Sequence, residues 1–370
     1  MSRLSEALSS LVPVDETSAA AAEERQNQLT KPPGALGGLE SLGSQLAAIA
    51  GKCPPPVPTR PVVTIFAGDH GVLAEGVSPW PVEVTAQMVT NFLAGGAAIN
   101  VIAREVGASL VAVDVGVATP IAEPPANAAT ANRLVRANVR PGTANFVHGP
   151  AMSLAEARQS IQVGLSVANK LVDQGADLLV TGDMGIGNTT PSAALVSAIT
   201  GWPARAVTGR GTGISDETLE AKIAVIEAGL NRVAAARSVA LTALNLVPGD
   251  MLLSELGGLE IGAIAGVAIG GALRRIPVVV DGVISLAGAL VAASLAPEVV
   301  GYLVAGHRSV EPGATAAMEH LGLEPLLDLK LRLGEGTGGC LAVPLVRAAA
   351  RILSEMATFG DAGVSGSTEG

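Results

Sequence analysis

The 370-residue sequence is poor in aromatic side chains and in cysteine. Only 2% of its residues are aromatic, so Ala, Gly, Leu and Val must fill the interior, which favours closely packed helices and buried strands. The two cysteines, Cys53 and Cys340, are too few for a disulfide framework or a zinc site. This cysteine usage suits a reducing compartment, and we expect a cytoplasmic protein.

Charge is also scarce: charged residues make up 15% of the chain, with a net charge of −10. Proteins that bind nucleic acid normally show a basic face, so this balance argues against a nucleic-acid partner. It does not argue against a small anionic ligand at a local site. The four histidines, His70, His148, His307 and His320, show no metal-ligand spacing, so we expect no metal site.

Long hydrophobic runs are missing as well. The two longest uncharged apolar runs, 261–273 and 283–297, fall short of the ~18 residues of a membrane-spanning helix. The N-terminus carries acidic residues and has no continuous apolar core, so it is not a secretory signal. These features predict a soluble protein with no membrane partner.

What the sequence does contain is a regular alternation of apolar strands and helices. Buried strands are predicted at residues 61–71, 109–117, 176–185, 276–284 and 299–308. Helical patterns lie between them, at residues 83–106, 153–174, 216–244 and 258–274. Continuous apolar strands in this alternation predict an α/β fold, with a parallel Rossmann-like sheet and helices on both faces.

Both ends of the chain are helical in pattern. Helices are predicted at residues 2–12, 16–30 and about 40–52, and a stiff proline-rich segment follows at 53–61. The segment from about 311 to 359 returns to a helical pattern. We therefore predict a large α/β domain over residues 56–310. A small helical domain would form from residues 1–55 and 311–370.

Polar residues follow the predicted strands. Four strands end in an acid, Asp69, Asp114, Asp183 or Asp281, and the fifth runs into His307. Ligands of parallel sheets bind outside the carboxyl ends of the strands, so this set predicts one functional edge. For any single aspartate, a cap on the following helix or turn is an equally good explanation.

The segment TGDMGIGNTTPSAAL, residues 181–195, joins a strand to a helix through a glycine-rich turn. Freed backbone N–H groups and the positive end of a helix together favour a bound phosphate. The pattern is not a P-loop, because no lysine follows the last glycine, and Thr190 interrupts a GxGxxG match. A tight turn without a ligand is the alternative explanation.

A second glycine-rich turn, TGRGTGISDETLEAK at residues 208–222, precedes another helix whose start is marked by Ser215. Arg210 and Lys222 could each meet a phosphate or a carboxylate. A solvated surface charge is the alternative for both. Lys222 carries slightly more weight, because the chain has few lysines.

Two further segments suggest a site for a flat ligand. A proline-framed loop with Ser78 and Pro79 leads into the helix that carries Gln87 and Met88, and such a loop could wall an apolar ligand. The alternative places Met88 in the core and Gln87 on the surface. In LRLGEGTGGC, residues 331–340, glycines flank a single acid, Glu335, and allow close approach of another group. A surface acid in a flexible turn is the alternative there.

Taken together, these segments resemble the nicotinate-nucleotide–dimethylbenzimidazole phosphoribosyltransferase family. The matching motifs span residues 30 to 365 or so and include KPPGALGGLE, AGDHGV, EGVSPWPVEVTAQMVTNFLAGGAAIN, TGDMGIGNTT, GRGTG, VVVDGVIS, GHRSVEPG, LDLKLRLGEGTGG and MATFGDAGVS. The resemblance implies a cofactor-free homodimer that transfers phosphoribose from nicotinate mononucleotide to dimethylbenzimidazole. The products would be nicotinate and alpha-ribazole phosphate, for the lower ligand of cobalamin.

The resemblance also implies roles for single residues. Glu335 matches the family's catalytic base. The benzimidazole would be lined by Ser78, Pro79, Gln87, Met88, Met184 and Leu333. The nucleotide would be held by Gly185, Gly187, Asn188, Thr189, Gly211 and Lys222. Two positions depart from the family: Asp183 stands where relatives often have Glu, and Ala314 where they often have His.

The chemistry suits one carboxylate, which can accept a ring N–H of a benzimidazole while the other ring nitrogen attacks. Two other classes of function stay open from the residues alone. A nicotinamide-dinucleotide oxidoreductase would need a complete GxGxxG and an acid ~20 residues further on, and neither is present cleanly. A non-catalytic nucleotide-binding or scaffold protein would need only the glycine-rich turns.

Overall fold

The computed structural model of the chain describes residues 3–122, 133–211 and 213–365. Six parallel strands form one sheet in the order β3-β2-β1-β4-β5-β6. The strands are β1 (Pro61–Gly68), β2 (Ser109–Gly116), β3 (Arg133–Arg136), β4 (Leu178–Met184), β5 (Val278–Val280) and β6 (Leu303–Ala305). The predicted α/β class is confirmed. Because the strand order reverses between β1 and β4, the carboxyl ends of these two strands mark where a ligand is expected.

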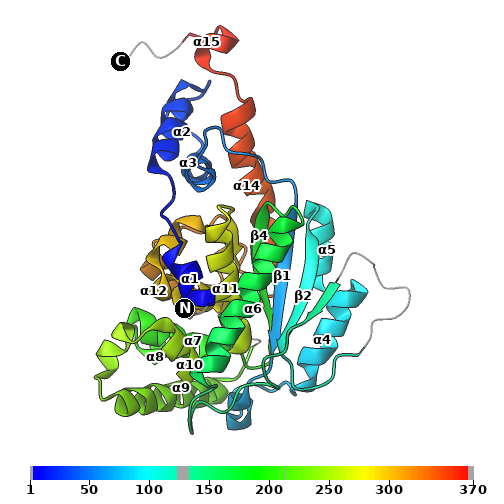
Figure 1. Cartoon of the computed structure of the whole chain (residues 1–370), viewed down its shortest axis with the longest axis vertical. Helices are drawn as coiled ribbons and strands as arrows, with labels where there is room; N and C mark the ends of the chain where they lie inside the picture. The colour runs from blue at the N-terminus through cyan, green and yellow to red at the C-terminus, as the bar shows by residue number, and fades with distance from the viewer. Residues whose placement is uncertain (1–2, 123–132, 212, 366–370) are drawn as a thin grey trace.

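The strands send alternate side chains to opposite faces of the sheet. In β1, Val62 and Phe66 pack into one hydrophobic core, whereas Val63 and Ile65 pack into the other. Helices cover both faces (Figure 1). The first face is covered by α6 (Leu154–Asp173) and α11 (Leu259–Leu273), and the second by α4 (Glu83–Ala94), α5 (Ala98–Val106) and α14 (Thr337–Glu355).

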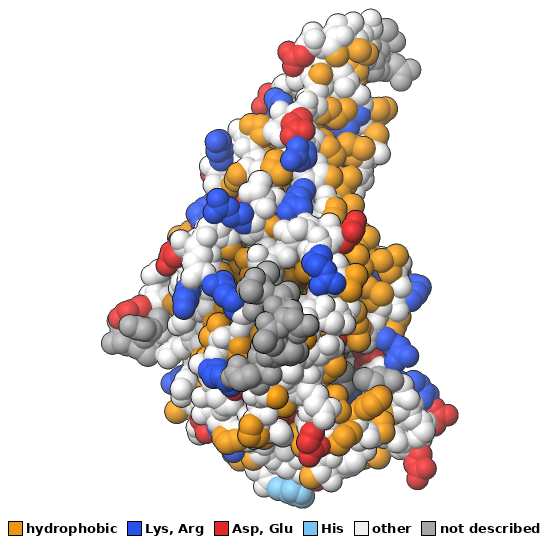
Figure 2. Space-filling view, turned by 90° about the vertical axis from the view of Figure 1, so that its right-hand side faces the viewer, with side chains coloured by type: hydrophobic (Ala, Val, Ile, Leu, Met, Phe, Trp, Pro, Cys, Tyr) orange, Lys and Arg blue, Asp and Glu red, His pale blue; other side chains and the backbone are white. Residues whose placement is uncertain are grey.

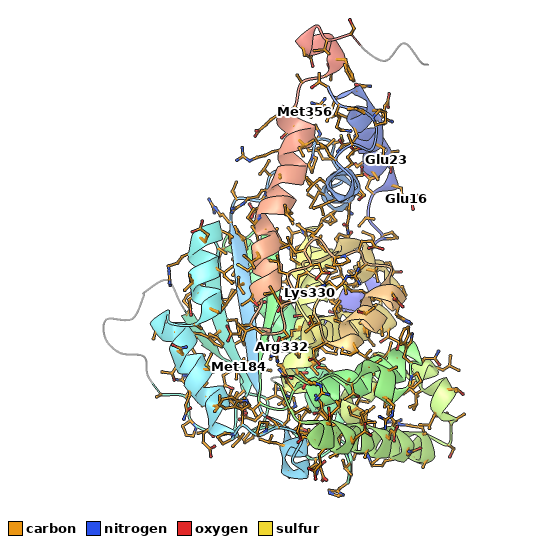
Figure 3. The ribbon with its side chains drawn as sticks, turned by 180° about the vertical axis from the view of Figure 1, so that it is seen from behind. Glu16, Glu23, Met184, Lys330, Arg332 and Met356 are labelled. Carbon is orange, nitrogen blue, oxygen red and sulfur yellow. The ribbon has the colours of Figure 1, made fainter. Side chains whose placement is uncertain are left out.

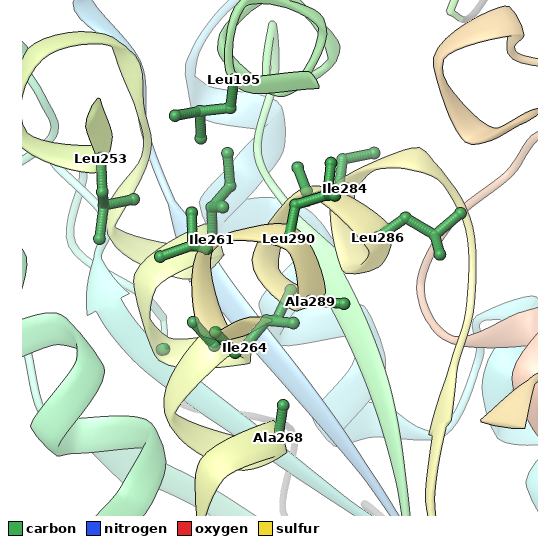
Figure 4. Close-up of a cluster of buried hydrophobic side chains, with 14 of the residues drawn as sticks. Leu195, Leu253, Ile261, Ile264, Ala268, Ile284, Leu286, Ala289 and Leu290 are labelled. Carbon is green, nitrogen blue, oxygen red and sulfur yellow. The ribbon is translucent and has the colours of Figure 1, made fainter. Parts of the chain in front are cut away.

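Small residues allow unusually close helix packing. A Cβ added to Gly164 of α6 would overlap the Ala263 carbonyl of α11, and one added to Gly266 would overlap the Ile161 carbonyl. The neighbouring α12 (Val283–Leu295) is also buried over most of its length. Figure 4 shows Ile261, Ile264, Ile284 and Leu290 in this cluster. Aliphatic side chains and glycine contacts thus replace the missing aromatic residues.

Helices from both ends of the chain form a projection at one end of the molecule (Figure 1). There α2 (Glu16–Gln28) and α3 (Gly38–Ala50) pack with α14 through Ala22, Ala47 and Leu353. The boundaries at residues 56 and 310 stay a prediction. In the structure α1 (Arg3–Ser9) contacts α6 and α11, and α13 (Pro312–Leu321) contacts α12, so both lie against the α/β body.

Most of the remaining elements lie around the carboxyl edge of the sheet, whereas α15 (Phe359–Ala362) lies at the tip of the projection and η3 (Pro297–Tyr302) directly precedes β6 (Figure 1). The other helices of this group are α7 (Thr189–Thr200), α8 (Ala204–Val207), α9 (Asp216–Arg237) and α10 (Gly249–Leu256). The other 3-10 helices are η1 (Gly71–Glu75) and η2 (Leu241–Leu246). Of these, α7 and α9 begin at the two glycine-rich turns of the sequence, and Ser215 caps α9 as predicted by accepting the Thr218 N–H.

Several predicted helix boundaries are wrong. The helix predicted at 83–106 is two helices, because Gly95 adopts φ 83° and ends α4. The helix predicted at 216–244 ends at Arg237, where Ser238 adopts φ 54°. The helical pattern at 311–359 is interrupted between α13 and α14 by an irregular segment. In each case, the helix ends at a residue with left-handed backbone, although the apolar pattern of the sequence continues beyond it.

Strand lengths also differ from the prediction. The strands predicted at 276–284 and 299–308 are three residues each, because Gly282 opens α12 and Pro297 opens the 3-10 helix before β6. The strand pattern does not reveal β3, whose sequence RLVR has an arginine at each end. The two apolar residues of β3, Leu134 and Val135, are too few to form a recognisable strand pattern.

One segment within the described residues, Glu83–Val106, has the length and apolar composition of a membrane span. It corresponds to α4 and α5, which are separated at Gly95. Both helices pack against the sheet, with Val89, Phe92 and Ile99 fully buried. Their apolar character is therefore used in the protein core.

Candidate active site

A cavity of about 350 Å³ opens at the carboxyl edge of the sheet. Most of the predicted site residues line it: Ser78, Met88, Met184, Gly185, Gly187, Asn188, Thr189, Gly211, Lys222, Leu333 and Glu335. Figure 3 shows Met184 near Arg332, below the lower end of α14, while Met356 marks the far end of that helix. The cavity therefore joins the end of β4 to the loop that precedes α14.

Two predicted residues, Pro79 and Gln87, do not line the cavity, and both are exposed. Gln87 precedes Met88 on α4, and one step along a helix turns the side chain by about 100°, which directs it away from the cavity. Pro79 lies at the tip of a turn in which the Ser78 hydroxyl accepts the Trp80 N–H at 3.2 Å. Gln87 is thus a surface amide in this structure, and its contact with the base stays a prediction.

The loop before α14 holds Glu335 in an unusual backbone conformation. Glu335 has φ 61°, and its neighbours Gly334 and Gly336 have φ 78° and 87°. A left-handed glutamate costs of the order of 1 kcal/mol and persists only when its surroundings fix it. Its backbone lies against Gly182 of β4, where an added Cβ would come within 2.5 Å of the Glu335 carbonyl oxygen. Glycine at position 182 is thus required for the close approach.

The Glu335 side chain is only 4% exposed, and its Oε2 atom has no hydrogen-bond partner. Burial raises the pKa of Glu335 to about 6, and the nearby Asp281 carboxylate adds to this rise. A hydrogen bond with the Ile99 backbone acts in the opposite direction. The result is a carboxylate that is ionised at neutral pH and still has an oxygen available to accept a proton.

A second acid, Asp183, lies close to the same loop. Its Oδ2 atom accepts a hydrogen bond from the Asn188 amide at 2.9 Å, and its Oδ1 atom has no partner. Burial, and then the charge of Asp281, raise the pKa of Asp183 well above its usual range. A Cβ on Gly334 would come within 3.1 Å of Oδ1, so this oxygen points toward the Glu335 loop.

The cavity is also lined by a buried cation. Lys222, on α9, is 1% exposed, and its Nζ atom donates to the Thr189 hydroxyl at 2.8 Å and to the Gly209 carbonyl at 3.1 Å. Burial lowers the pKa of Lys222 to about 8. The first residues of α7 line the cavity beside it and add the positive end of a helix dipole. This arrangement favours a phosphate.

Three polar residues that line the cavity, Ser309, Glu311 and Arg332, were not predicted, whereas His307 was predicted at this edge of the sheet. The Glu311 carboxylate accepts the Gly211 N–H at 2.8 Å, and Arg332 donates to the Gly211 carbonyl at 2.8 Å. These contacts fix the second glycine-rich turn. The sequence did offer one signal, because the motif GHRSVEPG follows a predicted strand. Which of its side chains point into the cavity depends on the fold.

The strand-end acids have different environments. Asp114 accepts the Val117 N–H at 3.0 Å, so for this residue the turn-cap interpretation is right. Asp183 lines the cavity, whereas Asp281 lies behind it and contacts the first turn of α14. Among the residues that the structure describes, no group of three or more His, Cys, Asp or Glu could hold a metal ion.

Comparisons with known proteins agree with this geometry. A family model described as phosphoribosyltransferase matches residues 11–364. The chain is 52% identical to the nicotinate-nucleotide–dimethylbenzimidazole phosphoribosyltransferase of Salinispora tropica, over 95% of this chain and 96% of the relative. It is also 52% identical to that of Chloroflexus aggregans, over 99% of both chains. The chain belongs to this family.

The fold of a family member also matches. The crystal structure of the Thermus thermophilus protein of the same name has a TM-score of 0.86 and 46% identity, and the match covers 95% of this chain and 100% of that one. The resemblance inferred from the motifs is therefore confirmed at the level of the family and the fold.

Proposed function

We propose that this chain transfers phosphoribose from nicotinate mononucleotide to dimethylbenzimidazole and so provides alpha-ribazole phosphate for the lower ligand of cobalamin. Membership of the family supports the reaction. The observation that carries the proposal is Glu335, a buried carboxylate with one oxygen without a partner, in the same cavity as the buried cation Lys222. Glu335 thus suits proton removal, and Lys222 suits a phosphate.

In this mechanism Glu335 is the catalytic base. Its unpartnered oxygen accepts the N–H proton of the benzimidazole while the other ring nitrogen forms a bond to C1 of the ribose. The bond from C1 to the nicotinate nitrogen breaks on the opposite face, which inverts the anomeric centre. The released electron pair neutralises the cationic ring nitrogen, so nicotinate leaves without a proton. The reaction needs neither a cofactor nor a metal.

The nucleotide end is proposed to hold the phosphate through Lys222 and the start of α7. Lys222 is already oriented by Thr189 and Gly209, so little ordering is needed when the phosphate binds. Gly185, Gly187 and Asn188 bring the backbone close to the nucleotide. Gly211 would meet the ribose or the phosphate from the second glycine-rich turn.

The base end is proposed to lie between apolar side chains. Met88, Met184 and Leu333 line the cavity together with Ser78, so a flat aromatic ring could lie against them near Glu335. Leu333 is 56% exposed, and a bound base would cover part of it. Pro79 and Gln87 were also predicted to contact the base, but they are exposed and do not line the cavity, so the proposed pocket does not include them.

The experiment that tests the function is a product assay with isotopically labelled nicotinate mononucleotide. Labelled nicotinate should be released only when a benzimidazole is present, together with the alpha-linked nucleotide. Release without a benzimidazole, or no release at all, would contradict the transfer. Offering several candidate bases in competition identifies the preferred acceptor.

We also propose that the protein is a cytoplasmic homodimer without a nucleic-acid or membrane partner. Hydrophobic side chains run along the projection on the face shown in Figure 2, and Trp80 and Leu329 are exposed large apolar residues. Light scattering should give a mass near twice the 36.8 kDa of one chain. A single-chain mass at micromolar concentration would contradict the dimer.

A further inference from the structure

The helix that follows the catalytic loop is capped by a residue from another part of the chain. The N-cap of α14, Gly336, has no side chain to accept the free N–H groups of the first turn. Asp281, which directly follows β5, accepts two of these N–H groups with its two carboxylate oxygens. Its Oδ2 atom accepts the Gly336 N–H at 3.1 Å, and its Oδ1 atom accepts the Gly339 N–H at 2.9 Å.

This cap acts on the peptide immediately after Glu335. The left-handed backbone of Glu335 is an unfavourable conformation that contacts around it must maintain. Asp281 holds Gly336, and Gly182 of β4 limits the loop from the other side. The direction of the Glu335 side chain therefore depends on where Asp281 holds the start of α14.

Asp281 is itself held by a histidine from the next strand. The Nε2 atom of His307 lies 3.3 Å from Oδ1 of Asp281, and both side chains are almost fully buried. The His307 ring packs so closely on Gly338 that an added Cβ there would overlap it. His307 lines the cavity, whereas Asp281 does not. A continuous set of contacts thus runs from β6 through β5 to the catalytic loop.

We propose that Asp281, supported by His307, is the positioning residue for Glu335. This inference rests on the proposed function, because it assigns Glu335 as the base. Asp281 touches neither reacting atom and acts through the backbone of Gly336 and Gly339. A misplacement of a catalytic group by about 1 Å can reduce the rate by about 100-fold, so the effect is measurable.

The charge of Asp281 provides a second readout. The charged and titratable groups around Glu335 are Asp281 after β5, Asp183 on β4 and His307 after β6, with Glu260 of α11 acting on Asp183. Because the Asp281 carboxylate raises the pKa of Glu335, a neutral residue at position 281 lowers that pKa. The acidic limb of the pH profile then moves to lower pH.

The test compares Asp281→Asn with the wild type in steady-state kinetics across pH. We expect kcat to fall about 10- to 100-fold, KM for nicotinate mononucleotide to stay within about threefold, and the acidic limb to move to lower pH. Asparagine keeps one acceptor but turns an N–H group toward the second backbone donor. Unchanged kcat with an unchanged acidic limb would overturn the proposal.

A double-mutant cycle separates positioning from a general loss of structure. If Asp281 acts through Glu335, Asp281→Asn should cause no further loss of kcat in a Glu335→Gln background. Additive losses would overturn the positioning role. Full activity of Glu335→Gln alone would instead refute the proposed base, whatever Asp281→Asn does, so the two failures are distinguishable.

A matched control is available in Asp114. This buried acid lies near the carboxyl end of β2 and accepts hydrogen bonds from the Val117 N–H and the Asn138 amide, but it does not line the cavity. Asp114→Asn should change thermal stability without moving the acidic limb. If Asp281→Asn does not fold, His307→Gln carries the test. It should reduce kcat in the wild type and not in the Glu335→Gln background, and an equal reduction in both would overturn the proposal.

Discussion

Two residues that line the cavity carry opposite charges in similarly buried surroundings. Lys222 and Glu335 are both almost completely buried, and burial moves the pKa of each toward neutrality, to about 8 for Lys222 and about 6 for Glu335. Their hydrogen bonding differs. Lys222 is held by Thr189 and Gly209, whereas Glu335 has one oxygen without a partner.

The hydrogen bonding of the two residues suits one of them to binding and the other to proton transfer. A cation that is already hydrogen-bonded is fixed in direction, which suits a group that only has to hold an anion. A carboxylate that acts as a base needs an oxygen without a hydrogen-bond partner and a raised pKa, and Glu335 has both. The following predictions test whether this division is real.

The largest effect is expected for Glu335→Gln. The amide keeps the shape of the side chain but cannot accept the benzimidazole proton, so kcat should fall about 1000-fold while KM changes little. Steady-state kinetics with both substrates measures this. Glu335→Asp serves as the control, because it keeps the carboxylate but shortens the side chain. Its activity should lie between those of the wild type and Glu335→Gln. A Gln variant as active as the wild type would refute the assigned base.

The next largest effect is expected for Lys222→Met. Methionine fills much of the same space but has no charge, so KM for nicotinate mononucleotide should rise about 10- to 100-fold. The effect on kcat should be much smaller. Lys330→Met is the control, since Lys330 is exposed and paired with Asp328 on the surface. If both variants raise KM equally, Lys222 has no special role in holding the phosphate.

Much of the fold could be predicted from the sequence because β-strands buried on both faces are continuously apolar. The sequence pattern revealed five of the strands, the glycine-rich turns and the start of α9 at Ser215. Element ends were less certain, because Gly95 and Ser238 end helices through backbone conformation and not through a change in apolarity. The sequence has no comparable signal for β3.

The site was predicted in part, and the limits have a physical cause. Glu335 was identified by its glycine neighbours and its family motif, and Lys222 by the glycine-rich turn that precedes its helix. Whether the other predicted residues line the cavity depends on the direction of their side chains. Gln87 and Met88 are adjacent, yet only Met88 lines the cavity. The contacts of Asp281 with α14 span 55 and 58 residues along the chain, so no local pattern could indicate them.

The pH profile offers a smaller and more specific test. Glu335 must be ionised and Lys222 protonated, so kcat/KM should be highest between about pH 6 and about 8 and should fall on either side. Lys222→Arg keeps its charge throughout this range, so its alkaline limb should flatten. Measuring kcat/KM for nicotinate mononucleotide in both proteins, from about pH 5 to about pH 10, checks this. An identical alkaline limb in both proteins would assign that limb to another group.

The smallest expected effect is on stability, and it has the opposite sign to the effect on activity. The folded pKa of Glu335 lies above its usual value of 4.5, so the stability that this group contributes is complete below about pH 4.5. It is lost as the pH rises through about 6, which amounts to roughly 2 kcal/mol at about 1.4 kcal/mol per pH unit.

Glu335→Gln should therefore gain free energy of unfolding relative to the wild type at pH 8, by roughly 2 kcal/mol more than at pH 4. Denaturant unfolding at the two pH values measures the difference. Glu40→Gln provides a control of opposite sign, because hydrogen bonds and Lys31 hold the pKa of Glu40 below its usual value. The Glu40 contribution is present above about pH 4.5 and is lost as the pH falls, so that variant should lose more stability at pH 8 than at pH 4. If Glu335→Gln followed the trend of Glu40→Gln, the Glu335 carboxylate would be stabilised by its surroundings and would be a poor base.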